Sequence, residues 1–101
     1  MTHATIVRYE TKPGSAEENE RLIRAVFAEL AATDPGGLRY AAFRLDDGVS
    51  FIHVAVIDAE ENPLAASRAF GEFQSTIKDR CATPPTPSRA TVIGSYGSRI
   101  E

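Results

Sequence analysis

The stretch Tyr40–Ile57, YAAFRLDDGVSFIHVAVI, decides the fold of this chain. Asp47-Gly48 stands between two runs of strand-forming residues, which predicts a β-hairpin with a type I′ turn, a turn that needs positive φ at both central positions. The run after the turn, Phe51–Ile57, does not alternate apolar and polar residues, so we expect both faces of that strand to be covered. In a chain of 101 residues, a partner subunit is the most economical cover for the second face.

A two-residue turn at Asp47-Gly48 also fixes which residues face one another across the hairpin. The expected pairs are Phe43 with Ile52, Ala42 with His53, and Arg44 with Phe51. One face of the hairpin is then purely apolar and holds Ala41, Phe43, Ile52, Val54 and Val56. The other face mixes apolar residues with three polar ones and holds Tyr40, Ala42, Arg44, Phe51, His53, Ala55 and Ile57.

The length and composition are those of one domain, residues 1–101, with a single modest core. The net charge is −3 and the basic residues are scattered, so we expect neither nucleic acid nor an anionic membrane as a partner. No apolar run approaches the roughly 20 residues that span a bilayer, and residues 1–5 lack the basic and apolar regions of a signal peptide. The single cysteine, Cys81, excludes an internal disulfide and fits a reducing compartment, so we expect a cytoplasmic protein.

The rest of the chain predicts the order strand, helix, strand, strand, helix, strand. Ala4–Glu10 has strand character, and Ser15 with Glu18 forms a capping box before a helix that Asp34-Pro35-Gly36-Gly37 ends. The apolar stripe of that helix is Leu22, Ile23, Val26, Phe27 and Leu30.

The second half of the chain completes this order. The hairpin is expected at Leu38–Leu45 and Val49–Ile57, and Asn62-Pro63 begins a second helix that ends near Arg80-Cys81. The apolar residues of that helix are Ala66, Phe70, Phe73 and Ile77. We expect Thr83–Pro87 to be a stiff extended connector and Ala90–Tyr96 to be the last strand. The predicted fold is α+β and ferredoxin-like (βαββαβ), with two helices on one face of a four-stranded antiparallel sheet.

His53 is the most suggestive residue for chemistry, because it stands mid-strand among apolar neighbours, where its pKa can be shifted. The plainer interpretation is a half-buried histidine hydrogen-bonded to Tyr40, to a backbone group or across an interface. Arg44, Tyr9 and Tyr40 are further candidates for handling protons or binding an oxyanion. Cys81 stands at a helix C-terminus, which does not lower a thiol pKa, and is expected to be inert.

Two other kinds of site lack their signatures. RNA-recognition modules share the βαββαβ order, but the stretch that would carry their stacking aromatics, Asp47–Val54, has an aspartate and valines at the deciding positions. The two histidines, His3 and His53, lie far apart and no Cys/His cluster exists, so no metal site is expected.

The chain from Thr5 to Tyr96 resembles the antibiotic biosynthesis monooxygenase-like domains of the dimeric α+β barrel superfamily. The resemblance rests on a first strand that ends at Lys12-Pro13-Gly14, the stretch Pro35–Tyr40 after the first helix, the hairpin, and the strand Phe51–Ile57. It implies a homodimer joined through its sheet faces, with a pocket between the helices and the sheet face that bears His53. The superfamily includes cofactor-independent oxygenases, haem-degrading enzymes, isomerases, cyclases and proteins of no known activity.

The chain departs from this family at several positions. Oxygenase members often carry a tryptophan where Ile57 stands, and this chain has no tryptophan. Haem-degrading members carry an asparagine near the position of Val7 and a histidine in or after the second helix, whereas Asn62–Cys81 contains no histidine. We therefore expect no haem breakdown by that route and no tightly bound cofactor.

Three functional hypotheses follow: a small oxygenase acting on an aromatic or polyketide-like compound, a non-catalytic binder of a small aromatic ligand, and a structural dimer whose pocket has filled in. A cavity between sheet and helices favours the first two, and a packed interior favours the third. The candidate catalytic residues are His53, Tyr40, Arg44 and Tyr9. The candidate substrate-binding residues are Phe27, Phe51, Ile57, Phe70, Phe73 and Val7.

Overall fold

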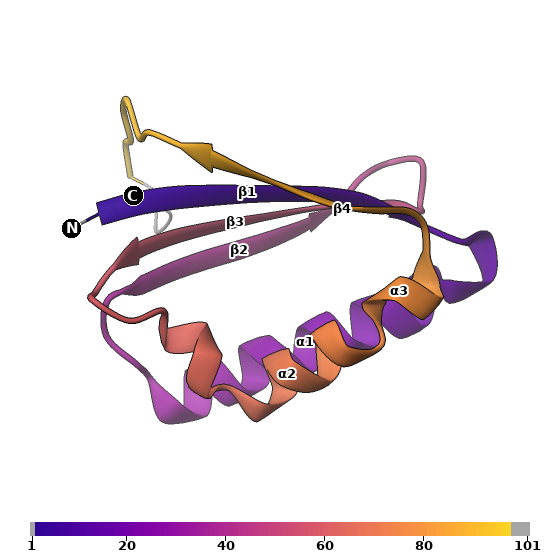
Figure 1. Cartoon of the computed structure of the whole chain (residues 1–101), viewed down its shortest axis with the longest axis horizontal. Coiled ribbons are helices and arrows are strands. Elements are labelled where there is room, and N and C mark those ends of the chain that lie inside the picture. Colours follow the sequence, from indigo (N-terminus) through magenta and orange to yellow (C-terminus); the bar gives the residue numbers. More distant parts are fainter. Residues whose placement is uncertain (1, 98–101) are drawn as a thin grey trace.

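Four antiparallel strands form one sheet in the order β2-β3-β1-β4 in the computed structural model, which describes residues 2–97. The strands are β1 (Thr2–Thr11), β2 (Leu38–Arg44), β3 (Ser50–Asp58) and β4 (Cys81–Ala90). All helices within residues 2–97 lie on one face of the sheet, and no helix of this range covers the other, open face (Figure 1). The expected ferredoxin-like α+β fold is therefore confirmed.

The first helix begins differently from the expectation. A 3₁₀ turn, η1 (Pro13–Ser15), leads into α1 (Ala16–Thr33), and Ser15 makes no side-chain capping bond. Its φ and ψ of −112° and −4° lack the extended conformation in which a serine caps the following turn. Glu18 instead accepts two hydrogen bonds from Arg21, so the predicted capping box is wrong. The helix ends as expected at Asp34, whose φ of 46° is left-handed.

The expected second helix is divided into three segments: η2 (Pro63–Ala66), α2 (Arg68–Ser75) and α3 (Ile77–Arg80). The Asn62 side chain caps η2 as predicted, and Ser67 caps α2 by accepting a hydrogen bond from the Phe70 amide. The hydroxyls of Ser75 and Thr76 both donate to the Glu72 carbonyl. Such local side-chain bonds compete with helix continuation, and the helix is interrupted at this point, between α2 and α3.

The hairpin has the predicted register with a different turn. Phe43 pairs with Ile52, Ala42 with His53 and Arg44 with Phe51. Within the turn only Gly48 has a positive φ, 80°, so the predicted type I′ turn is wrong. The Asp47 carboxylate accepts hydrogen bonds from the amides of Val49 and Ser50 and from the Ser50 hydroxyl. The register survives because the observed loop, residues 46–49, is centred on the same point as the predicted one.

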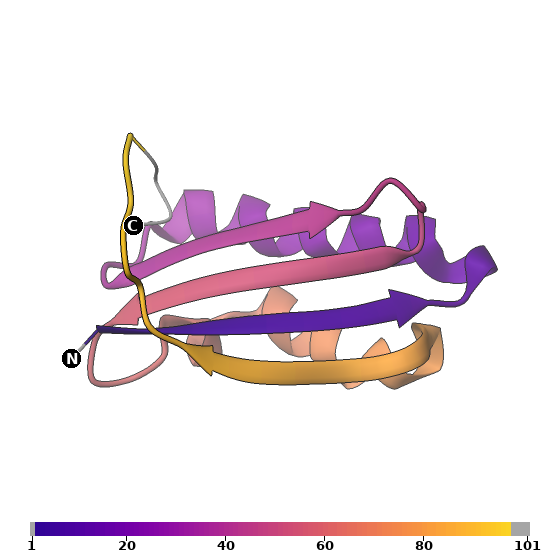
Figure 2. The ribbon, with the colours of Figure 1, turned by 90° about the horizontal axis from the view of Figure 1, so that it is seen from above.

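The last strand lies earlier in the sequence than expected. Thr83–Pro87 is part of β4 rather than a connector, and residues 91–95 are not a strand. Because β4 is at the edge of the sheet, one side of the strand faces solvent and pairs with no other strand. A proline whose nitrogen points to that side costs no hydrogen bond of the sheet, although it has no N–H donor. Residues 91–97 instead cross the open face of the sheet (Figure 2).

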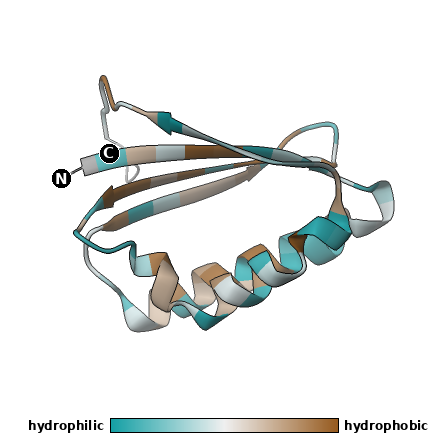
Figure 3. Cartoon of the chain, viewed as in Figure 1, coloured by the Kyte–Doolittle hydropathy of each residue, from teal (hydrophilic) through white to brown (hydrophobic). Residues whose placement is uncertain are grey.

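The core lies between the sheet and the helices. Hydrophobic stretches lie along β1 and β3, and hydrophobic and hydrophilic residues alternate along the helices (Figure 3). The buried cluster consists of Tyr9, Ala16, Ile23, Val26, Phe51, Leu64 and Phe73. Two polar residues, Asn19 and Thr11, are fully buried beside it. None of the helices within residues 2–97 has the length and apolar character needed to cross a membrane.

Candidate functional site

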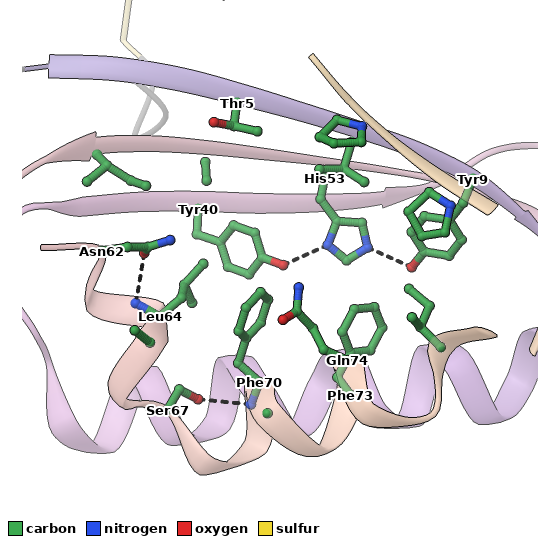
Figure 4. Close-up of a pocket in the computed structure, with 18 residues that line it drawn as sticks. Thr5, Tyr9, Tyr40, His53, Asn62, Leu64, Ser67, Phe70, Phe73 and Gln74 are labelled. Carbon is green, nitrogen blue, oxygen red and sulfur yellow. Dashed lines mark hydrogen bonds between the residues drawn. The ribbon is translucent and has the colours of Figure 1, made fainter. Parts of the chain in front are cut away.

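His53 lies between two tyrosines on the sheet face that points to the helices. Its neighbours come from both flanking strands. Tyr9 of β1 pairs with Phe51, and Tyr40 of β2 pairs with Ala55. Phe51 and Ala55 each stand two positions from His53, so both tyrosines share its sheet face. The Tyr40 hydroxyl is 2.7 Å from His53 Nδ1, and the Tyr9 hydroxyl is 2.7 Å from His53 Nε2 (Figure 4). The histidine is 6% exposed, so these tyrosines take the place of water at both ring nitrogens.

A buried polar chain continues from Tyr9 into the helices. Asn19 of α1 donates from Nδ2 to the Tyr9 hydroxyl at 2.8 Å, and Arg80 of α3 donates from Nε to Asn19 Oδ1 at 2.9 Å. The remaining guanidinium nitrogens of Arg80 donate to the Thr76 hydroxyl and the Phe73 carbonyl. Every buried side-chain polar atom in residues 2–97 has a partner, as a stable buried network requires.

Sequence reasoning missed Asn19 and Arg80. Asn19 stands one turn before Ile23 on the buried stripe of α1, and a polar residue at such a position is a signal that could have found it. Arg80 gives no comparable signal, because its burial depends on how α3 packs against α1.

Burial sets the charges of this group. It lowers the pKa of His53 to about 4 and raises the pKa of both Tyr9 and Tyr40, because the charged form of each side chain would lose its hydration. At neutral pH the imidazole and the two phenols are therefore uncharged. The cluster can donate and accept hydrogen bonds, and the arginine at its far end supplies its one positive charge.

A cavity of about 630 Å³ lies beside this group, between the sheet, η2 and α2. Tyr40, His53 and Tyr9 contribute its polar sheet side, and Phe70 and Phe73 rise from α2 on the opposite side (Figure 4). Four of the predicted wall residues line it: Val7, Ile57, Phe70 and Phe73. Gly71, Gln74 and Pro87 line it as well and are exposed, so the cavity opens between α2 and the edge strand. Gln74 was not among the predicted residues.

Two predicted wall residues support the site from outside the cavity. Phe27 stacks on the Tyr40 ring with centroids 5.0 Å apart, and Phe51 stacks on the Tyr9 ring at 5.6 Å. Neither ring lines the cavity, so their expected role as ligand walls is not found. Their stacking holds the two tyrosine rings in place instead.

Arg44 does not line the cavity that His53 lines. Its guanidinium donates to the carboxylates of Glu17 and Glu20 on α1 and to the Gly48 carbonyl. The two residues share a sheet face, but α1 carboxylates hold the arginine at the turn end of the hairpin, where it lines a separate depression. The expected convergence of Arg44 and His53 in one pocket is therefore wrong.

No group of three or more His, Cys, Asp or Glu residues within the described range is arranged to hold a metal ion. Cys81 is a free thiol whose pKa is raised by burial.

Comparison with known proteins identifies the fold. No family model matches the sequence, and no curated protein matches it. Solved structures do match. A Nitrosomonas europaea protein provisionally named an antibiotic biosynthesis monooxygenase is 18% identical, with a TM-score of 0.75 over 95% of this chain and 94% of that one. A Bacteroides thetaiotaomicron protein with the same provisional name is 14% identical, with a TM-score of 0.77 over 91% and 90%.

A Mycobacterium tuberculosis protein is 15% identical, with a TM-score of 0.75 over 94% of this chain and 98% of that one. At identities this low the likeness establishes the fold and leaves the activity open. The chain has the fold of the proteins named antibiotic biosynthesis monooxygenases, as its sequence pattern implies.

Proposed function

We propose that the protein binds a small aromatic or polyketide-like compound in this cavity and acts on it as an oxygenase without a tightly bound cofactor. The observation that carries the proposal is the cavity itself, whose volume of about 630 Å³ is within the usual range for small-molecule sites. Its walls are mostly apolar and aromatic, and the polar side chains of Tyr9, Tyr40 and His53 converge at the sheet side. The names of the structural neighbours point to the same class of protein.

Oxygenation without a cofactor requires the substrate to supply the electrons. A ring CH₂ group can do so: its two C–H bonds break, the O–O bond breaks, one oxygen forms a C=O bond and the other leaves as water. No external reductant is needed. Tyr40 would hold an existing carbonyl oxygen of the substrate, which increases the acidity of a C–H bond conjugated with that carbonyl and favours reaction with dioxygen.

A specific observation supports binding without turnover as the alternative. Both ring nitrogens of His53 are engaged by tyrosines, and burial lowers its pKa to about 4, so it is a poor base at neutral pH. The third hypothesis, a structural dimer with a filled interior, has less support because the cavity is present.

Anthrone is a suitable probe, because it has three fused rings, a carbonyl oxygen and an acidic ring CH₂. We expect anthrone to shift the NMR signals of cavity residues and to be converted to the corresponding quinone, with one atom from labelled dioxygen found by mass spectrometry. Tyr40→Phe should slow conversion, whereas Tyr96→Phe, at a position 97% exposed, should not. Binding without conversion above the protein-free rate would favour the binder. The absence of both binding and conversion would contradict the proposed site.

We also propose that two copies pair through their open sheet faces. Phe43 of β2 is 47% exposed on this face, and Ile6 of β1, on the other side of β3, is 38% exposed. In the segment that crosses the face, Ile93 and Tyr96 are 98% and 97% exposed. Covering such a patch removes apolar surface from water, and patches of this kind mark interaction sites in soluble proteins.

We propose a cytoplasmic location for this protein. The free thiol of Cys81, the one cysteine of the sequence, supports it because reducing compartments keep such thiols unpaired.

A further inference from the structure

The direction of the buried hydrogen-bond chain can be worked out from its arginine end. A guanidinium can only donate, so the Asn19 amide atom 2.9 Å from Arg80 Nε must be the oxygen. The reversed amide would place two donors against each other. The Asn19 NH₂ group therefore faces the other way and donates to the Tyr9 hydroxyl at 2.8 Å.

The hydrogen bonds of Tyr9 decide which nitrogen of His53 carries the proton. Its hydroxyl already accepts from Asn19, and the residue is 2% exposed, so its own proton has His53 Nε2 as its acceptor at 2.7 Å. Nε2 is then unprotonated. A neutral imidazole carries its proton on the other nitrogen, so Nδ1 donates to the Tyr40 hydroxyl at 2.7 Å.

Tyr40 ends the chain at the cavity. Because its oxygen accepts from His53, its own proton is not used within the chain, and the residue lines the cavity (Figure 4). We infer that Tyr40 presents a hydroxyl proton to the cavity, and that Arg80, Asn19, Tyr9 and His53 fix it in that role. This inference rests on the proposed ligand site and narrows its ligand to a compound with a carbonyl or quinone oxygen at that end.

The opposite direction is disfavoured by burial. It would require His53 Nε2–H to donate to Tyr9, which would then accept two hydrogen bonds and leave its own proton without an acceptor. A buried donor without a partner is costly, because no water replaces the missing acceptor. Asn19 is therefore a positioning residue: it acts on the ligand through Tyr9, His53 and Tyr40.

Asn19→Asp tests the direction with almost no change of shape. A carboxylate accepts from both Arg80 and Tyr9, so the Tyr9 proton turns to residue 19, Nε2–H donates to Tyr9, and the Tyr40 proton turns to Nδ1. NMR of ¹⁵N-labelled histidine distinguishes the two tautomers at neutral pH without a ligand. We expect the proton of His53 on Nδ1 in the natural protein and on Nε2 in Asn19→Asp.

Asn62→Asp is the matched control. It adds the same charge at the cavity but lies outside the chain, and an aspartate can keep the cap on the Leu64 amide. We expect His53 to stay protonated on Nδ1 in this variant. A natural protein with the proton on Nε2, or an Asn19→Asp protein with the proton on Nδ1, would overturn the inference.

Two bicyclic probes of similar size test the consequence for ligands. 1-Indanone can only accept a hydrogen bond through its carbonyl oxygen, whereas the N–H group of indole can only donate. By NMR titration the natural protein should prefer 1-indanone by about tenfold, the typical worth of one hydrogen bond, and Asn19→Asp should reverse the preference. Equal affinities in the natural protein would contradict the inference. Expected tautomers with no binding of either probe would support the direction of the chain and contradict the proposed function.

Discussion

Arg80 and Asn19 are joined by a buried hydrogen bond of 2.9 Å although 61 positions separate them in the sequence. Arg80 is 5% exposed and Asn19 is fully buried. A buried guanidinium is tolerated only when its donors are satisfied, and here Asn19, Thr76 and Phe73 accept from it. This contact fixes α3 against α1 and sets the direction of the hydrogen bonds that reach His53.

Replacing Asn19 by leucine should destabilise the protein. The variant keeps a similar volume but leaves Arg80 Nε without an acceptor and removes the donor to Tyr9. We expect a loss of about 2–3 kcal/mol in the free energy of unfolding, measured by chemical denaturation. Glu18→Leu, on the neighbouring exposed position of α1, is the control and should change stability little. Equal losses in the two variants would show that the buried network contributes nothing.

The stability of the fold should fall as the pH is lowered from about 7 to 5. The His53 pKa is about 4 in the folded protein and 6.5 in the unfolded chain, so the unfolded state binds the extra proton first. The stabilisation is complete above the unfolded pKa and is lost as the pH falls toward the folded one. We expect a loss of about 2 kcal/mol over this window.

His53→Gln, which does not titrate, provides the control for this pH dependence. Hydrogen bonds to the carboxylates of Glu20 and Asp47 lower their pKa values. The contribution of these carboxylates to the stability of the fold is therefore lost only below this pH window. The natural protein and the variant should therefore differ in slope between about pH 7 and 5. Parallel stability curves would mean that His53 is not held neutral by burial.

Gly71 offers a way to close the cavity without disturbing the core. It lies inside α2 at the cavity mouth, and a Cβ there would meet no atom within 4 Å. Gly71→Leu should abolish binding of 1-indanone in an NMR titration, because the side chain enters the mouth. Gly71→Ala should keep binding. Both should raise the free energy of unfolding by roughly 0.5–1 kcal/mol, since glycine is a poor helix former. Undiminished binding in Gly71→Leu would place the ligand elsewhere.

Val54→Asp tests the proposed dimer. Val54 lies on the open sheet face beside Ile6, its partner in the β1–β3 pairing. A carboxylate buried in a subunit interface has no partner, so the variant should dissociate into monomers or unfold. Sedimentation velocity at micromolar concentration is the measurement. Ala25→Asp, on the exposed helix side, should remain dimeric. A natural protein that sediments as a stable monomer would refute the pairing.

The sequence predicted the hairpin register, the sheet face that bears His53 and the fold, because these follow from local signals. The hydrophobic pattern of Phe51–Ile57 and the position of the turn act over a few residues and need no distant contact. The errors occur where a distant or competing contact decides. The proline-rich stretch became β4 because it lies at the edge of the sheet beside β1. The Asp47 side chain replaced the expected turn geometry through its own hydrogen bonds.

The sequence by itself determined the hairpin register, the apolar stripe of α1 and the placement of Tyr40 and His53 on one face, since strand and helix periodicity are local properties. Only the tertiary structure decided which polar groups meet. Arg44 was drawn to the α1 carboxylates, whereas Asn19 and Arg80 came together beneath Tyr9. The physical reason is that a buried polar group must find its partner wherever packing brings one, and the packing of α1 against α3 and β1 is not encoded in the sequence around any of these residues.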